Sequence, residues 1–215
     1  PYKEGQTLKE NTTTFDFTVA DKAADQKDLL WANATSQIAA NSASTKEKVK
    51  INFYHALSRL GYTVKLSGNY SSNNVTFILK NITLAGSTDG NTPAFYKTGT
   101  IDLAKTKTET GLWSNYTGGK LFFNWYSGEY NIPEPQAGTT EPSPSHPDKD
   151  NKGTIEKDKD YLFVIPQNFS EKIEEAGQQK DNPDKLYVIV KYTIKYDGGG
   201  EQTNTVYKQI KKDFK

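Results

Sequence analysis

The chain has 215 residues, of which 34% are hydrophobic and 25% charged, and its 27 basic and 26 acidic residues leave a net charge of +1. This balance, with Arg59 as the only arginine, argues against a nucleic-acid-binding protein, which usually has a basic excess and arginine contacts to bases and phosphates. The absence of cysteine excludes disulfides, thiolate catalysis and cysteine-based zinc sites.

The segment 44–61 supports two interpretations. A capping box at Ser44 and Glu47, followed by apolar residues at helical spacing, is typical of a helix. The alternation Val49, Ile51, Phe53 resumes at residues 60–66 after a change of phase near residues 55–58, as expected for a bulged strand. Propensity alone does not decide between them.

Six segments are predicted strands because they are rich in β-branched and aromatic residues and are bounded by turn residues. They are 74–84, 100–103, 120–126, 161–165, 186–196 and 203–210. The turn sequence at 197–200 predicts that the last two form a hairpin. Many short strands separated by turns predict an all-β sandwich.

The segment 133–160 interrupts this pattern. It contains five prolines and many charges and has no apolar period. Such a composition cannot bury enough apolar surface to form an element of its own. We therefore expect a flexible surface loop at 133–160.

Candidates for catalysis are few, because most nucleophile–base pairs need a histidine and the chain has only His55 and His146. His146 lies in the proline-rich segment, where we expect nothing to hold it in place. His55 is expected to be a structural, hydrogen-bonded residue beside the strand bulge. Asp158, Asp160 and the glutamates within 171–175 fit solvated charge runs. The sequence predicts no enzyme, no catalytic residue, no cofactor and no metal site.

A cluster of aromatic residues between positions 112 and 130 favours a binding module as an alternative. Its composition, with Asn and Gly among the rings, suits stacking against sugars, and the candidate glycan platform consists of Trp113, Tyr116, Trp125 and Tyr126. The competing interpretation is that alternate members fill the sandwich core, because a strand interleaves two faces. Exposure of both tryptophans would favour glycan binding, and burial of both would argue against it.

Six short blocks lie in a distinctive order between residues 28 and 196. They are Asp-Leu-Leu-Trp-Ala at 28–32 with Phe-Tyr-His-Ala-Leu-Ser-Arg-Leu at 53–60, a strand and small loop at 80–86, Gly-Thr-Ile-Asp-Leu at 99–103, Phe-Val-Ile-Pro-Gln at 163–167 and a tyrosine-rich strand at 187–196. This order resembles that of the Bacteroidetes fimbrillin family. The resemblance favours the strand interpretation of 44–61.

For the fold, the resemblance implies a transthyretin-like Greek-key β-sandwich of about seven strands. Family members are longer, with a first sandwich ahead of the Asp-Leu-Leu block and a final strand after the last hairpin. We therefore expect residues 1–44 to be the remnant of an N-terminal domain. Residues 45–215 are expected to form a sandwich that lacks its final strand.

For the function, the resemblance implies a structural subunit of a cell-surface fimbria, or pilus, that supports adhesion. Such subunits are exported as lipoprotein precursors to the outer membrane and assemble by β-strand exchange between protomers. The expected partners are other fimbrial subunits, with host or bacterial surface glycans or proteins as further candidates. The alternative is a surface-exposed carbohydrate-binding lipoprotein module.

Overall fold

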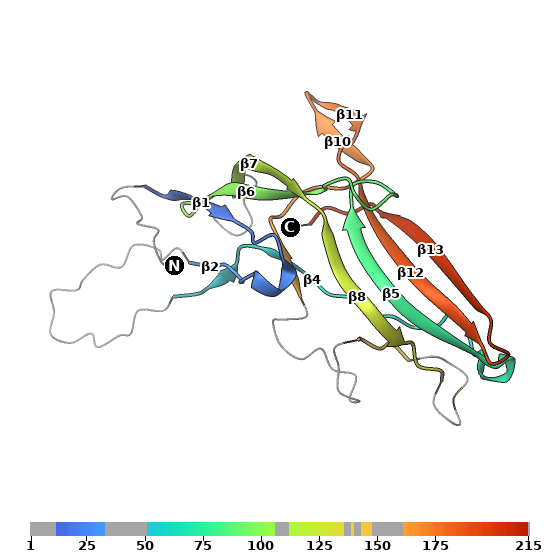
Figure 1. Ribbon diagram of the computed structural model, residues 1–215. Coiled ribbons are helices and arrows are strands. Elements are labelled where there is room, and N and C mark those ends of the chain that lie inside the picture. Colours follow the sequence, from blue (N-terminus) through green and yellow to red (C-terminus); the bar gives the residue numbers. More distant parts are fainter. Residues whose placement is uncertain are drawn as a thin grey trace, which may run out of the picture.

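The chain folds almost entirely into antiparallel β-strands (Figure 1). The computed structural model describes residues 12–32, 51–105, 112–135, 139, 143–147 and 161–214. Within these residues, helical structure is limited to two 3-10 turns, η1 at Ala23–Asp25 and η2 at Ser71–Asn73. The strands form one four-stranded sheet, one three-stranded sheet and shorter pairs. The predicted all-β sandwich class is confirmed, whereas the Greek-key connectivity stays a prediction.

The four-stranded sheet has the order β13-β12-β5-β8. Its strands are β5 (Val75–Ala85), β8 (Phe123–Asn131), β12 (Leu186–Tyr196) and β13 (Glu201–Ile210). The strands predicted at 74–84, 186–196 and 203–210 are confirmed, with small differences at their ends. β12 and β13 form the predicted hairpin in an unbroken register, and Gly199, with a φ of 90°, lies in its turn.

The three-stranded sheet has the order β1-β6-β7, with β1 at Thr14–Thr18, β6 at Phe95–Asp102 and β7 at Trp113–Leu121. The prediction of one continuous strand at 120–126 is wrong, because the chain leaves β7 at Leu121 and enters β8 of the other sheet at Phe123. Phe123 is buried and Leu121 packs against the same cluster, while Phe122 between them is 38% exposed. The run of apolar residues at 121–123 is therefore the point where the chain crosses from the three-stranded sheet to the four-stranded sheet.

The described part of segment 44–61 is extended, so the strand interpretation is correct for residues 51–61, and residues 44–50 lie outside the described residues. β3 (Tyr54–His55) pairs with β2 (Leu30–Trp31), and β4 (Ser58–Leu60) pairs with β9 (Leu162–Val164). The predicted break in phase falls at residues 56–57, where two consecutive apolar side chains are buried. Burying both requires the interruption of the strand.

Two hydrophobic clusters form the core. The first contains Val19, Leu29, Trp31, Ala56, Leu57, Ile101, Trp113, Phe163 and Ile165. The second contains Leu84, Ala94, Phe95, Phe123, Leu162, Val164, Phe169 and Leu186. β9 supplies alternate residues to both clusters, which explains why its sequence is apolar at every position. Residues 19–31 share a cluster with residues 101–165, and the domain division predicted near residue 44 stays a prediction.

A small hairpin of β10 (Lys172–Glu175) and β11 (Gln178–Asp181) projects at the top of the view in Figure 1. Its side chains are mostly exposed, as its charged sequence predicts. No helix among the described residues is long and apolar enough to cross a membrane.

Candidate functional site

The two histidines occupy different environments. His55 Nδ1 lies 2.5 Å from Asp28 Oδ2 and its side chain is 64% exposed, so the expectation of a hydrogen-bonded residue beside the strand break is confirmed. His146 is buried, with its ring centroid 4.4 Å from that of Tyr62. The expectation that nothing holds His146 is wrong, because the backbones of Ser145 and Val64 exchange two hydrogen bonds and fix this part of segment 133–160.

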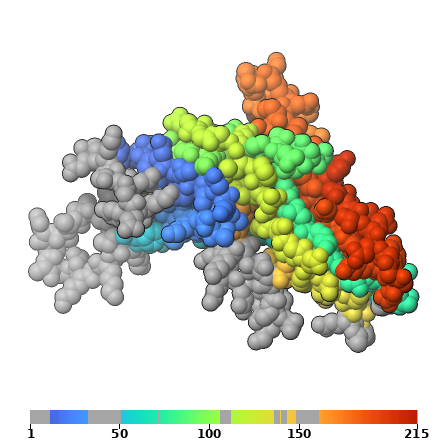
Figure 2. All heavy atoms as spheres, in the orientation of Figure 1, coloured from blue at the N-terminus to red at the C-terminus, as the bar shows by residue number. Residues whose placement is uncertain are grey.

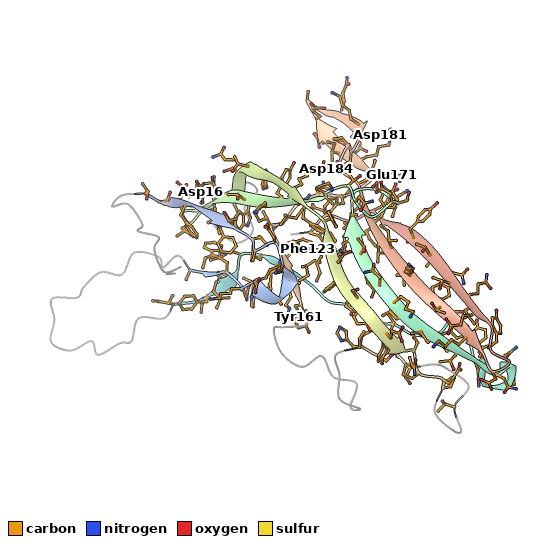
Figure 3. All side chains as sticks on the ribbon, viewed as in Figure 1. Asp16, Phe123, Tyr161, Glu171, Asp181 and Asp184 are labelled. Carbon is orange, nitrogen blue, oxygen red and sulfur yellow. The ribbon has the colours of Figure 1, made fainter. Side chains whose placement is uncertain are left out.

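The charged side chains are dispersed rather than gathered at one site. Figure 3 shows Asp16 on β1, far from Glu171 and Asp181 beside the small hairpin. The hydrogen bond from Lys172 lowers the pKa of the Asp181 carboxyl, and the hydrogen bond from Lys211 lowers the pKa of Glu171. These are exposed ion pairs. Among the described residues, no group of three His, Asp or Glu side chains is placed to hold a metal ion.

The four residues of the candidate glycan platform lie on β7 and β8, which belong to different sheets. Trp113 is 7% exposed in the first cluster, where its Nε1–H donates a 2.8 Å hydrogen bond to the Ala56 carbonyl oxygen. Trp125 is half-buried against the second cluster and Tyr126 is also half-buried. Tyr116 is 39% exposed and stacks on Tyr96 at 4.4 Å between ring centroids. The two tryptophans are thus separated between the clusters.

An apolar groove with a volume of about 1040 Å³ lies beside β1 and β2. The groove is lined by Phe15, Phe17, Thr18, Val19, Ala20, Asp25, Gln26, Lys27, Asp28, Leu29, Leu30, Trp31, Ala32, Ile51, Phe53 and Leu103. Three of these are large apolar side chains that remain substantially exposed: Leu30 at 43%, Ile51 at 51% and Phe53 at 65%. The groove therefore leaves large apolar side chains exposed to solvent.

β1 contributes Phe15, Phe17 and Thr18 to the lining of the groove. β1 pairs with β6 on one side, and within the described residues no strand pairs with its other side. Phe15 and Phe17 are half-buried while Thr14, Asp16 and Thr18 are exposed. The strand β1 was not predicted from the sequence, although the alternation Phe15, Phe17, Val19 is the period-2 signal that predicts a strand. β1 thus places two half-buried phenylalanine side chains against the groove.

Among the described residues, the ionisable side chains that line the groove are those of Asp25, Lys27 and Asp28, and Asp28 bonds His55. The rest of the described lining is mostly apolar. An apolar groove beside an edge strand suits an extended polypeptide, which can pair its backbone and insert alternate side chains.

A family model described as fimbrillin-like matches residues 1–207, nearly the whole chain. Searches of curated proteins and of solved structures gave no match. The family is structural and non-enzymatic. The chain belongs to the fimbrillin-like family.

Proposed function

We propose that this protein is a structural subunit of a cell-surface fimbria, that it assembles by strand exchange between protomers, and that the groove beside β1 accepts the donated strand. Its partners are other fimbrial subunits, and the assembled fimbria supports adhesion. Export as a lipoprotein precursor to the outer membrane belongs to the same proposal. The groove is the single observation that carries the assembly mechanism.

The physical argument rests on what the groove leaves exposed. An unpaired strand edge presents N–H and C=O groups in a row, and a strand laid beside β1 would satisfy them. Its alternate side chains would enter the groove and cover Leu30, Ile51 and Phe53, which are 43–65% exposed. Complete burial of one such side chain contributes up to about 1.5–3 kcal/mol. A donated strand therefore gains from both its backbone and its side chains.

A carbohydrate-binding module is the second candidate. The observation that favours it is the exposed Tyr116 ring stacked on Tyr96, with the Lys120 ammonium 4.5 Å from the Tyr96 ring centroid. The burial of Trp113 argues against the larger platform. Strand exchange is the better supported function.

The test of strand exchange uses two apolar residues of the groove and one matched control. In the full-length protein, we expect Leu30→Glu and Phe53→Glu to abolish filaments seen by electron microscopy, because a carboxylate in the groove would be buried without a partner. Phe122→Glu replaces an apolar residue that is 38% exposed outside the groove, and should leave filaments intact.

Both groove residues are already exposed, so the monomer should keep its melting temperature in each variant. Filaments of normal length from the Leu30→Glu and Phe53→Glu variants would exclude the groove as the acceptor. If the unsubstituted full-length protein formed no filaments at all, the fimbrial proposal itself would fail.

A further inference from the structure

β13 is an edge strand with a full row of outward-facing backbone groups. It pairs with β12 on one side, and within the described residues its other side has no strand partner. The Tyr196 N–H donates to the Gly200 carbonyl oxygen in the hairpin, so even-numbered residues of β13 bond to β12. The N–H and C=O groups of the odd-numbered residues, 201, 203, 205, 207 and 209, therefore point away from the sheet.

The side chains of β13 show that its two faces are both incompletely covered. Val206 is 49% exposed and Tyr207 is 61% exposed, and because they are consecutive they lie on opposite faces of the sheet. A molecule docked on one face would cover only one of them. A further strand added in the plane of the sheet would flank both.

β13 carries Glu201 and Lys208 but lacks two features by which proteins block an exposed edge. These two features are bulges and prolines. β8, at the opposite edge of this sheet, pairs with β5 through two register shifts. β13 pairs with β12 over ten consecutive residues without a shift and contains no proline. An edge this regular is suited to continuing the sheet.

We propose that β13 pairs antiparallel with β13 of a second copy of this chain, around a two-fold axis at Thr205. A two-fold axis perpendicular to a sheet pairs residues of equal parity, and only the odd-numbered residues have free backbone groups. Thr205 is the midpoint of that set, so this register alone engages all five of them. Glu201 then lies opposite Gln209 of the second copy, and Thr203 opposite Tyr207 of the second copy.

The side chains are compatible with this register. Glu201 and Lys208 each meet a glutamine, at 209 and 202 of the second copy, so no like charges are opposed. The two copies of Val206 become diagonal neighbours across the axis on one face. Tyr207 meets a threonine on the other face, a pairing of two residues favoured in strands.

The position of β13 keeps this contact separate from the groove. In Figure 2 the red β13 lies at the opposite end of the molecule from the blue residues 12–32 that line much of the groove. The pairing of two β13 strands therefore does not depend on strand exchange. A protein that fails one test can still pass the other.

Disulfide trapping tests the register directly, because the chain has no cysteine of its own. Glu201→Cys and Gln209→Cys, mixed under mild oxidation, should form a cross-linked dimer at least tenfold faster than either variant alone. Directly opposed residues have Cα atoms about 5.5 Å apart, which a disulfide spans. Two copies of Glu201 would be about 27 Å apart along the strands, at about 3.4 Å per residue.

A mixture of Glu201→Cys with Thr203→Cys is the matched control, because these positions are about 20 Å apart in the proposed register, at about 3.4 Å per residue. Its cross-linking should not exceed that of the single variants. Equal rates in the two mixtures would overturn the proposed register.

Sedimentation equilibrium supplies a second, independent readout. Thr205→Pro removes an N–H that points away from β12, and should raise the dimer dissociation constant at least tenfold. Thr205→Val keeps the N–H and should leave the constant within about twofold. Circular dichroism must show that both variants keep the melting temperature. An unsubstituted chain that stays monomeric at millimolar concentration would overturn the proposal.

Discussion

His55 and Trp113 are both hydrogen-bonded, yet they contribute differently to the fold. His55 bonds Asp28 from a side chain that is 64% exposed, so water competes for the His55 ring. Trp113 is 7% exposed and donates to the Ala56 carbonyl oxygen from within the first cluster. A buried partner that loses its bond has no water to replace it. The buried hydrogen bond of Trp113 is therefore expected to contribute more to the free energy of unfolding than the exposed one of His55.

This difference predicts unequal effects on stability. His55→Ala should lower the free energy of unfolding by less than about 1 kcal/mol, the range of exposed ion pairs. Trp113→Phe should lower it by about 1–3 kcal/mol, because the Ala56 carbonyl oxygen loses its donor. Urea unfolding measures both values. If His55→Ala abolished assembly without changing the melting temperature, His55 would have a functional role.

At the scale of elements, a strand can be predicted from the sequence when the contacts that determine it are close together in the chain. β12 and β13 were predictable because their alternation and the glycine turn lie within one continuous segment. The end of β7 at Leu121 was not, because the crossing depends on which cluster Phe123 joins. The groove was not predictable either, since residues 15–32, 51–53 and 103 meet there only in the folded chain.

Two exposed ion pairs, Lys172–Asp181 and Lys180–Glu175, link the strands of the β10–β11 hairpin, which should therefore loosen in acid. Lys172 and Asp181 are directly opposed in the register, and this hydrogen bond lowers the pKa of Asp181 below its ordinary value of 3.8. A lowered carboxyl pKa stabilises the fold above the ordinary value, and that stabilisation is lost as the pH falls through the lowered one. The Glu171 pKa is lowered in the same direction.

Hydrogen exchange, corrected for its intrinsic pH dependence, should therefore show protection of β10–β11 falling between about pH 5 and pH 2, ahead of β12. Asp181→Asn should weaken the hairpin at neutral pH and reduce this pH dependence. Protection that is independent of pH in the unsubstituted protein would show that the ion pairs do not hold the hairpin.

Limited proteolysis distinguishes the paired strands from the proline-rich segment. Arg59 lies in β4, paired with β9, and its guanidinium lies 4.4 Å from the Tyr161 ring centroid. We expect trypsin to cut first within 133–160, at Lys149, Lys152, Lys157 or Lys159, which lie outside the described residues, because proteases need a locally extended substrate. Mass spectrometry of a timed digest identifies the first site. Early cleavage at Arg59 would contradict the protection of β4.

At the scale of the whole molecule, the two hydrophobic clusters meet along β9, and the four-stranded sheet extends away from them (Figure 1). The groove lies beside β1 and the unblocked edge is β13. This separation would let the two proposed contacts with other polypeptides form independently of each other. Such an arrangement suits a building block better than a binding pocket for a small molecule.

The pairing of β12 also determines the order in which the protein can fold. Its partner β13 follows immediately in a hairpin, whereas its other partner β5 lies about a hundred residues earlier, with Leu84 opposite Val188. The hairpin closes quickly, but docking it on β5 requires the closure of a long loop. Until that happens, the edge of β5 that pairs with β12 stays open. This edge of β5 therefore needs protection from wrong partners until β12 and β13 have formed.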